Sequence, residues 1–317
     1  MIDDPRLDGE IRAVQAAAEA AAAAYPPIRL ELPLDPHRAV NDALAMPLAE
    51  GGPRMAASEE RWVFAHGRRV LCRVHRPRID AALPALVYIH GGGWVWSSID
   101  THDRLAREYA AAAGIAVVNV DYSLSPEARF PAALMECAGV VRALAAEGAG
   151  WGLDPTRLAL GGDSAGGNLA LATALLLRDA NGPRLRGILA AYPVCDSDTD
   201  TESYREFAEG YVLTRAKMRF YWDCYTAHAA DRLNPLAAPL RADLAGLAPV
   251  LIQLAELDVL RSEGEALARR LAGAAVPVEC VTYPGMLHGF MRTTEAVAVA
   301  RAAVAAAGEW LRRHLSG

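Results

Sequence analysis

The chain has 317 residues, of which 53% are hydrophobic and 22% are charged, and its formal net charge is -6. This composition is that of a globular protein able to bury a large core, and it excludes a disordered or fibrous chain. The negative charge argues against nucleic acid or an anionic membrane surface as the main partner. No stretch reaches the roughly 18 uninterrupted apolar residues of a membrane-spanning helix, so no membrane span is expected.

The five cysteines are widely scattered and include no Cys-x-x-Cys pair. Their odd number and spacing predict buried, reduced thiols rather than a disulfide framework. Residues 16–24 resemble the apolar part of a signal peptide, but acidic residues precede them where basic residues would be needed. Cytoplasmic residence is therefore the expectation.

Helical patterns come first along the chain. Apolar residues at helical spacing and an alanine run predict a helix over 7–24, and a second helix is expected near 38–46. From residue 61 the apolar period changes to two, which is typical of strands. A His66-Gly67 turn between two such runs predicts a β-hairpin. The N-terminal part is thus expected to be a helical segment that leads into the edge of a sheet.

From Pro84 onward, short apolar runs alternate with helical patterns. Strands that are apolar along their whole length, alternating with helices, indicate a mostly parallel sheet with helices on both faces. The predicted strands are 85–89, 115–120, 158–160, 187–192, 249–255 and 278–283. The predicted helices are 104–113, 131–147, 164–179, 263–274 and 295–314. The aromatic-rich span 196–235 interrupts this alternation and is predicted to be a helical insertion over one end of the sheet.

A serine follows the predicted strand 158–160 at the point where a helical pattern begins. The spacing Gly162-x-Ser164-x-Gly166 is typical of a tight strand-to-helix turn that exposes a nucleophilic hydroxyl above the sheet. Small residues also cluster in turns for steric reasons alone. The motif by itself is therefore a weak indication of catalysis.

A serine hydroxyl needs a general base, and the base needs a group that fixes its tautomer. His288 and Asp258 each follow a predicted strand, so both are expected at the same edge of the sheet as Ser164. A loop histidine or a helix-capping aspartate would explain either residue alone. Because all three occur at strand ends, in the chain order typical of α/β-hydrolases, they are predicted to form a catalytic triad.

A run of glycines, His90-Gly91-Gly92-Gly93, follows the predicted strand 85–89. Consecutive glycines let backbone N–H groups point at one place, as an oxyanion hole requires. We expect the N–H groups of Gly92, Gly93 and Ala165 to form this hole, and His90 to order the loop. No dinucleotide motif or metal-ligand spacing is present, so neither a cofactor nor a metal is expected.

Aromatic residues near these motifs are candidates for the substrate pocket. The candidates are Trp94, Trp96, Tyr192 and Tyr211. Bulky side chains beside the glycine loop would narrow the acyl pocket and favour short acyl chains. Ordinary core packing explains the aromatic residues of the 196–235 insertion equally well.

Taken together, the motifs resemble those of the hormone-sensitive-lipase-like family of α/β-hydrolases, and among them bacterial acetyl esterases. The matching segments are 90–93, 121–127, 162–167, 192–193, 258–264 and 288–290. The family usually has proline where Val259 stands and an acidic residue where Ser262 stands.

The resemblance implies an α/β-hydrolase fold with a helical cap. The cap would comprise 1–55 and 196–235, and the core 56–195 and 236–317. The resemblance also implies cofactor-free hydrolysis of a small-molecule ester, and a homodimer.

The predicted function is hydrolysis of short-chain acyl esters by a serine carboxylesterase through a Ser-His-Asp acyl-enzyme mechanism. A deacetylase, a lactonase or a lipase would use the same triad and stays an alternative. A non-catalytic small-molecule receptor on the same scaffold is disfavoured, because such receptors replace the catalytic histidine and His288 is present.

Overall fold

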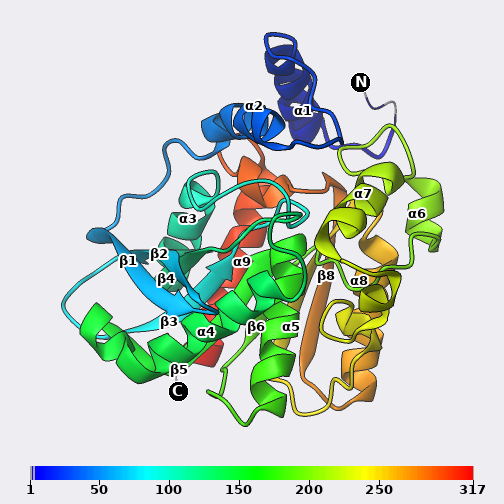
Figure 1. The fold of residues 1–317 in the computed structure, drawn as a ribbon. Helices are drawn as coiled ribbons and strands as arrows, with labels where there is room; N and C mark the ends of the chain where they lie inside the picture. Colours follow the sequence, from blue (N-terminus) through cyan, green and yellow to red (C-terminus); the bar gives the residue numbers. More distant parts are fainter. Residues whose placement is uncertain (1, 3, 317) are drawn as a thin grey trace.

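The computed structural model describes residue 2 and residues 4–316. An eight-stranded sheet forms its centre, in the spatial order β1-β2-β4-β3-β5-β6-β7-β8. β2 runs antiparallel to both β1 and β4, whereas the remaining neighbours are parallel. The predicted mostly parallel α/β sheet is therefore confirmed (Figure 1).

The helices and strands match the predicted segments, with ends that differ by a few residues. The strands are β1 (Ala57–Ala65), β2 (Arg68–Arg76), β3 (Leu83–Ile89), β4 (Ala116–Asp121), β5 (Leu153–Asp163), β6 (Ile188–Ala191), β7 (Val250–Leu257) and β8 (Val278–Leu287). The α-helices are α1 (Gly9–Ala22), α2 (Asp35–Ala45), α3 (Asp103–Ala113), α4 (Ala132–Glu147), α5 (Ala165–Asp179), α6 (Glu202–Glu206), α7 (Arg215–Tyr225), α8 (Arg261–Gly273) and α9 (Ala298–Leu315). Short 3-10 helices include η5 (Phe290–Thr293).

Three strands run further than the apolar pattern predicts. β5 spans Leu153–Asp163 and so extends beyond both ends of the predicted 158–160. β7 continues to Leu257 and β8 to Leu287, beyond the predicted ends at residues 255 and 283. The pairing shifts register after Ala255, and the two strands then pair again at Leu257 and Leu287. Asp258 and His288 consequently follow directly on paired strand residues, which fixes their backbones more firmly than a free loop would.

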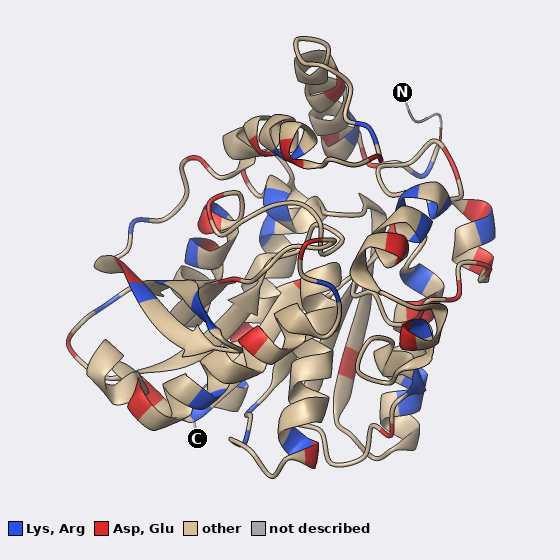
Figure 2. Cartoon of the chain, in the orientation of Figure 1, with Lys and Arg blue, Asp and Glu red and all other residues tan. Residues whose placement is uncertain are grey.

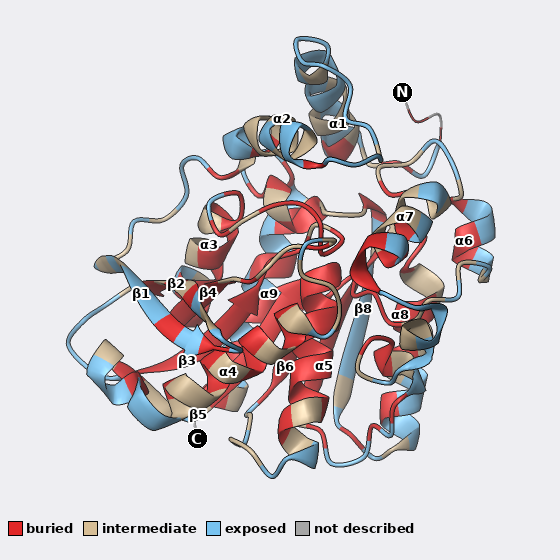
Figure 3. Ribbon diagram, viewed as in Figure 1, coloured by how far each residue is buried: buried red, intermediate tan, exposed pale blue. Residues whose placement is uncertain are grey.

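Helices cover both faces of the sheet, and the central strands are buried between them. α3 and α9 pack against each other, and α4 and α5 are neighbours on the other face (Figure 1). Every residue of β3 and β6 is buried, which is why these strands read as continuous apolar runs. Figure 3 shows the central strands and α5 buried, whereas much of β1, β8 and the outer helices is exposed. Figure 2 shows charged residues on the outer helices, the β1–β2 hairpin and the loops.

Two segments far apart in the sequence lie together on the side where α5 begins (Figure 1). The N-terminal segment contributes α1 and α2, and the insertion at 196–235 contributes α6 and α7. Polar contacts join them, because Arg6 donates to Glu206 at 2.7 Å and the Tyr211 hydroxyl donates to Asp4 at 2.8 Å. The two segments thus form one layer beside the carboxyl ends of the parallel strands.

Candidate active site

Ser164 occupies the turn between β5 and α5 in a backbone conformation that side chains rarely adopt. Its φ of 55° and ψ of -121° lie outside the ordinary allowed regions, at a cost of roughly 1–3 kcal/mol. The flanking glycines permit this turn. A Cβ at Gly162 or at Gly166 would overlap the backbone carbonyl oxygen of Ile89. Because Gly162 and Gly166 lack a Cβ, α5 can start directly against β3. The Ser164 side chain then lies at the edge of the sheet.

The structure brings the three predicted triad residues together. The Nε2 atom of His288 lies 2.9 Å from the Ser164 hydroxyl oxygen, and its Nδ1 atom lies 2.6 Å from Oδ2 of Asp258. This geometry fits the neutral imidazole whose Nδ1–H donates to Asp258 and whose Nε2 accepts from Ser164. Asp258 is buried, and its other oxygen accepts the Leu260 N–H at 3.1 Å. The arrangement can therefore take a proton from the serine and stabilise the resulting imidazolium.

Three backbone N–H groups beside Ser164 are open for a ligand. Gly92 and Gly93 line the same pocket as Ser164, and within residues 4–316 neither N–H donates to a protein acceptor. The Ala165 N–H is the first of α5, so it has no acceptor within the helix. Both glycines have positive φ values, of 118° and 60°, which bend the loop over the serine. The predicted oxyanion-hole residues are thus adjacent to the nucleophile, and their role as a hole stays a proposal.

Asp163 ties the glycine loop to the serine turn. Its Oδ1 accepts from the Tyr88 hydroxyl at 2.6 Å and from the Gly91 N–H at 3.0 Å, while Nε2 of His102 lies 3.6 Å from its Oδ2. Burial raises the pKa of Asp163, but attraction to His102 and the Tyr88 hydrogen bond outweigh it and hold the pKa well below the usual range. A charged carboxylate thus holds in place the loop on which an oxyanion hole depends.

His90 lies behind this loop, as expected of a structural residue. Its Nδ1 lies 2.8 Å from the Gly91 carbonyl oxygen, and its ring stacks on Tyr122 at 4.4 Å. Burial lowers the pKa of His90 to about 3, so the ring stays neutral near pH 7. A neutral, buried imidazole of this kind fixes the loop and is out of reach of the pocket.

The pocket around Ser164 has a volume of about 240 Å³ and is small. Of the predicted aromatic lining residues, Trp96 borders it. Trp94, Tyr192 and Tyr211 do not: Trp94 is fully buried and stacks on Tyr225 at 4.1 Å, and Tyr192 packs beneath His288 with ring centroids 4.8 Å apart. Tyr211 faces the N-terminal segment through its bond to Asp4. Trp94 and Tyr192 therefore pack in the core, which corrects their assignment to the pocket, and Tyr211 packs against the edge of that core.

Several lining residues were not singled out from the sequence. They are Asn41, Ser97, His102, Asp163, Val212, Leu213, Lys217, Tyr221, Gly289 and Arg292. Asn41 belongs to α2, and Lys217 and Tyr221 belong to α7, so both peripheral segments close over the serine. Two signals were available in the sequence: Asp163 stands inside the serine motif, and Lys217 is the only lysine in the chain.

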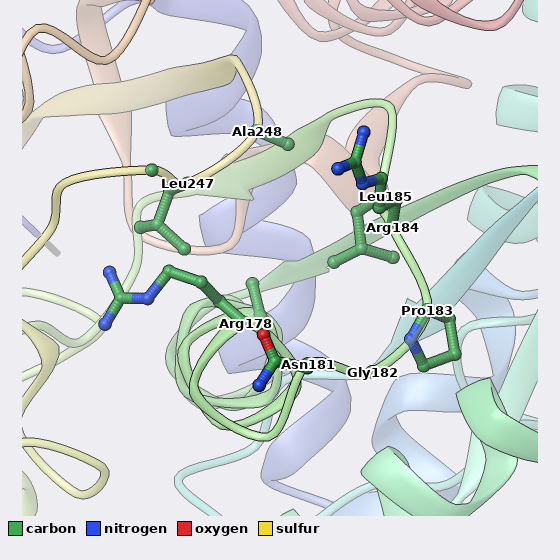
Figure 4. A pocket seen from close by; sticks show the side chains of 10 residues that line it. Arg178, Asn181, Gly182, Pro183, Arg184, Leu185, Leu247 and Ala248 are labelled. Atoms are coloured by element: carbon green, nitrogen blue, oxygen red, sulfur yellow. The ribbon is translucent and has the colours of Figure 1, made fainter.

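A second pocket lies at the other end of α5, near Arg178 (Figure 4). Arg178 and Arg184 border it with Asn181 and Leu247, and Arg178 already donates to the carbonyl oxygens of Asp243 and Ala245. It contains neither a nucleophile nor a base.

In the part of the chain that the structure describes, no group of three or more metal-ligating side chains is present. No helix in that part has the length and apolar character needed to cross a membrane.

A family model described as the alpha/beta hydrolase fold matches residues 86–292, from β3 to beyond His288. The chain belongs to the α/β-hydrolase fold family. The resemblance to its hormone-sensitive-lipase-like members is confirmed by the matched range, which includes the glycine loop, the serine turn and the Asp258 and His288 segments.

Proteins similar to this α/β-hydrolase are named as ester hydrolases. It is 37% identical over 256 residues to the ethyl acetate hydrolase of Pseudomonas putida, covering 78% of this chain and 80% of that protein. It is 39% identical over 219 residues to the carboxylesterase NlhH of Mycobacterium tuberculosis, covering 68% and 69%. A solved thermostable esterase from Pseudomonas putida matches with a TM-score of 0.92 at 37% identity over 98% of both chains. An ester-hydrolase from the metagenome of Lake Arreo matches with a TM-score of 0.92 at 32% identity, over 98% of this chain and 100% of that one.

The Tyr88 hydroxyl offers a test of the Asp163 network. Tyr88→Phe removes one donor from a buried carboxylate, so we expect the free energy of unfolding to fall by about 1–3 kcal/mol. Urea denaturation measures this change. Esterase activity is expected to fall several-fold because the Gly91 loop is less firmly held.

Tyr109→Phe is the matched control. Its ring lies 5.5 Å from that of Tyr88, but its buried hydroxyl has no hydrogen-bonding partner among the described residues. Removing that hydroxyl is expected to leave stability unchanged or to raise it slightly. Equal losses in the two variants would show that the Tyr88–Asp163 bond has no special role.

Proposed function

We propose that this carboxylic-ester hydrolase is a serine carboxylesterase that acts on small acyl esters through Ser164, His288 and Asp258. The observation that carries the proposal is the pair of contacts made by His288, at 2.9 Å to the serine hydroxyl and at 2.6 Å to the aspartate. A general base in a serine hydrolase needs this arrangement, with one ring nitrogen at the serine hydroxyl, the other at a carboxylate, and the serine in a pocket.

Acylation begins when His288 takes the proton of the Ser164 hydroxyl through Nε2. The serine oxygen attacks the ester carbonyl carbon, and the carbonyl oxygen becomes an oxyanion. The N–H groups of Gly92, Gly93 and Ala165 hold this oxyanion in our proposal; support comes from the two glycines that border the pocket with Ser164 and from Ala165 as the first residue of α5. Loss of a single such donor typically costs about 10²- to 10³-fold in kcat. His288 then gives its proton to the alcohol, which leaves, and the acyl group stays on Ser164.

Deacylation repeats these steps with water. His288 takes a proton from the water molecule, which attacks the acyl carbon, and the second oxyanion occupies the same three N–H groups. Collapse of this intermediate breaks the bond to Ser164, releases the acid and returns the proton to the serine. Asp258 accepts the Nδ1–H of His288 and stabilises the imidazolium.

We propose that residues 1–55 and 196–235 form a cap over a catalytic core of 56–195 and 236–317. Support comes from Asn41 of α2 and Tyr221 of α7, which border the pocket with Ser164. Tyr221 lies so close to Gly93 that a Cβ on the glycine would meet its ring.

A homodimer and a cytoplasmic location are also proposals, the latter supported by five cysteines that form no disulfide.

One prediction of the proposed mechanism concerns the nucleophile, Ser164. Ser164→Ala should lower kcat for ester hydrolysis by at least about 10⁴-fold, because only oxyanion and binding contributions remain. A fluorophosphonate probe should label the wild-type protein on Ser164 and leave the variant unlabelled. Circular dichroism and the thermal midpoint provide the folding control.

A folded Ser164→Ala protein with near-full activity would rule this mechanism out. A wild-type protein inert to the probe would instead support the non-catalytic receptor. Neither result would follow from a deacetylase, a lactonase or a lipase, since all three share the triad; a panel of their substrates separates those alternatives.

Another prediction concerns the length of the substrate's acyl chain. A pocket of about 240 Å³ bordered by Trp96 and Tyr221 accommodates a short acyl chain, so kcat/KM on p-nitrophenyl esters should peak at acetate to butyrate and fall steadily toward palmitate. A maximum at long chains would contradict the short-chain proposal and favour a lipase.

A further inference from the structure

The chain contains a single lysine, Lys217, and the fold places it in the pocket of Ser164 and His288. Every other one of its 32 basic Lys and Arg residues is an arginine. Lys217 lies in the first turn of α7, where its backbone N–H donates to the Thr214 side chain at 3.2 Å. A helix cap therefore fixes the backbone of Lys217 beside the pocket.

The ammonium group of Lys217 has spare hydrogen-bonding capacity. Nζ donates to the Val212 carbonyl oxygen at 2.7 Å, and within residues 4–316 no carboxylate forms an ion pair with it. A lysine ammonium has three N–H donors, so two remain. By contrast, Arg215 in the same turn of α7 lies 3.7 Å from Asp200. Lys217 thus presents an uncompensated charge to the pocket.

Arg292 adds a second cation to the same pocket. Its guanidinium donates to the carbonyl oxygens of Thr101 at 2.9 Å and Ala45 at 3.3 Å, and its buried Nε has no hydrogen-bonding partner in the described part of the chain. No described carboxylate forms an ion pair with Arg292 either. The acidic residue that borders the pocket is Asp163, whose oxygens are engaged by Tyr88, Gly91 and His102.

The Asp163 carboxylate attracts Arg292 and offsets its charge, so the uncompensated positive charge in this small pocket is that of Lys217. We propose that Lys217 binds a carboxylate of the substrate, so that the enzyme prefers small esters that carry an acid group close to the ester bond. The carboxylate can belong to the acyl part, as in a monoester of a dicarboxylic acid, or to the alcohol part, as in an acylated hydroxy acid. The inference rests on the proposed function, because it names the substrate class of that same site.

Energetics support this pairing. Burial lowers the pKa of Lys217, which reflects the cost of removing an ammonium from water without a counter-charge. An anionic substrate supplies that counter-charge. Hydrogen bonds to charged groups contribute about 1.5–3 kcal/mol, equivalent to roughly 10- to 100-fold in kcat/KM at 1.36 kcal/mol for each factor of ten.

The experiment compares esters that differ only in charge. Monoethyl succinate and its amide, ethyl succinamate, test the acyl side, while acetoxyacetate and acetoxyacetamide test the alcohol side, with hydrolysis followed in a pH-stat at neutral pH. We expect kcat/KM to favour the carboxylate over the amide by at least about 10-fold in one of the two pairs. The pair that shows the preference identifies the side of the ester on which the acid group sits.

Two variants assign the preference to Lys217. Lys217→Met keeps the apolar stem and removes the charge, so it should lower kcat/KM on the carboxylates by about 10-fold more than on the amides and thereby abolish the preference. Lys217→Arg should retain much of the preference. Arg219→Met is the matched control, because Arg219 is an exposed cation on the same helix, bonded to Thr199 and outside the Ser164 pocket. It should leave the preference intact.

The outcomes separate this inference from the proposed function. Hydrolysis of all four esters with no preference for the carboxylates would overturn the inference and leave the esterase in place. A uniform loss of activity on acids and amides in Lys217→Met would also overturn it, since Lys217 would then only hold the Val212 carbonyl and the cap. An absence of hydrolysis with every ester, p-nitrophenyl acetate included, would contradict the proposed function itself.

Discussion

The close approach of α5 to β3 is the constraint on which the rest of this structure depends. The helix starts so near the Ile89 carbonyl that only glycine fits at positions 162 and 166. Ser164 is consequently held in a conformation with positive φ, and its hydroxyl lies 2.9 Å from His288. The strain is tolerated because nearly all of α5 is buried against the sheet, and this burial stabilises the helix as a unit. The serine is thus positioned by packing before any substrate is present.

Buried polar groups extend this constraint to the remaining parts of the site. Asp163, directly before the serine, accepts from Tyr88 and from the Gly91 backbone, so hydrogen bonds join the glycine loop to the serine turn. β7 and β8 pair up to Leu257 and Leu287, which fixes the residues that follow them. The catalytic geometry therefore comes from backbones anchored in one sheet, while the layer of α2 and α7 supplies the walls of the pocket. When the sheet positions the reacting residues and a separate layer lines the pocket, substitutions in that layer can change the substrate preference without removing the reacting residues.

Local patterns were enough to predict the sheet, the order of its elements and the meeting of Ser164, Asp258 and His288. Short apolar runs, glycine spacing and the order of Ser164, Asp258 and His288 are properties of nearby residues, and the fold only has to bring the strand ends together. The exact ends of β7 and β8 were not predictable, because their pairing beyond residue 283 depends on a register shift between two strands. Glycine and proline at 284–285 normally end a strand, and here the neighbouring strand overrides them.

The walls of the pocket were harder to predict for a physical reason. Trp94 and Tyr192 stand beside catalytic motifs in the sequence, yet large rings gain most by full burial, and both lie in the core. Lys217 and Arg292 reach the pocket from segments that are far apart in the chain. Their meeting depends on how the segment with α7 packs beside the carboxyl ends of the strands, which no local pattern encodes.

The central claim is that Ser164, His288 and three backbone N–H groups act together on one ester carbonyl. A crystal structure of the protein after reaction with a p-nitrophenyl phosphonate tests it most directly, because the bound phosphorus imitates the tetrahedral intermediate. The account predicts a bond from phosphorus to the Ser164 oxygen, a phosphoryl oxygen within hydrogen-bonding distance of the N–H groups of Gly92, Gly93 and Ala165, and His288 beside the serine oxygen. Phosphorus attached to a different residue, or a phosphoryl oxygen turned away from those N–H groups, would contradict it.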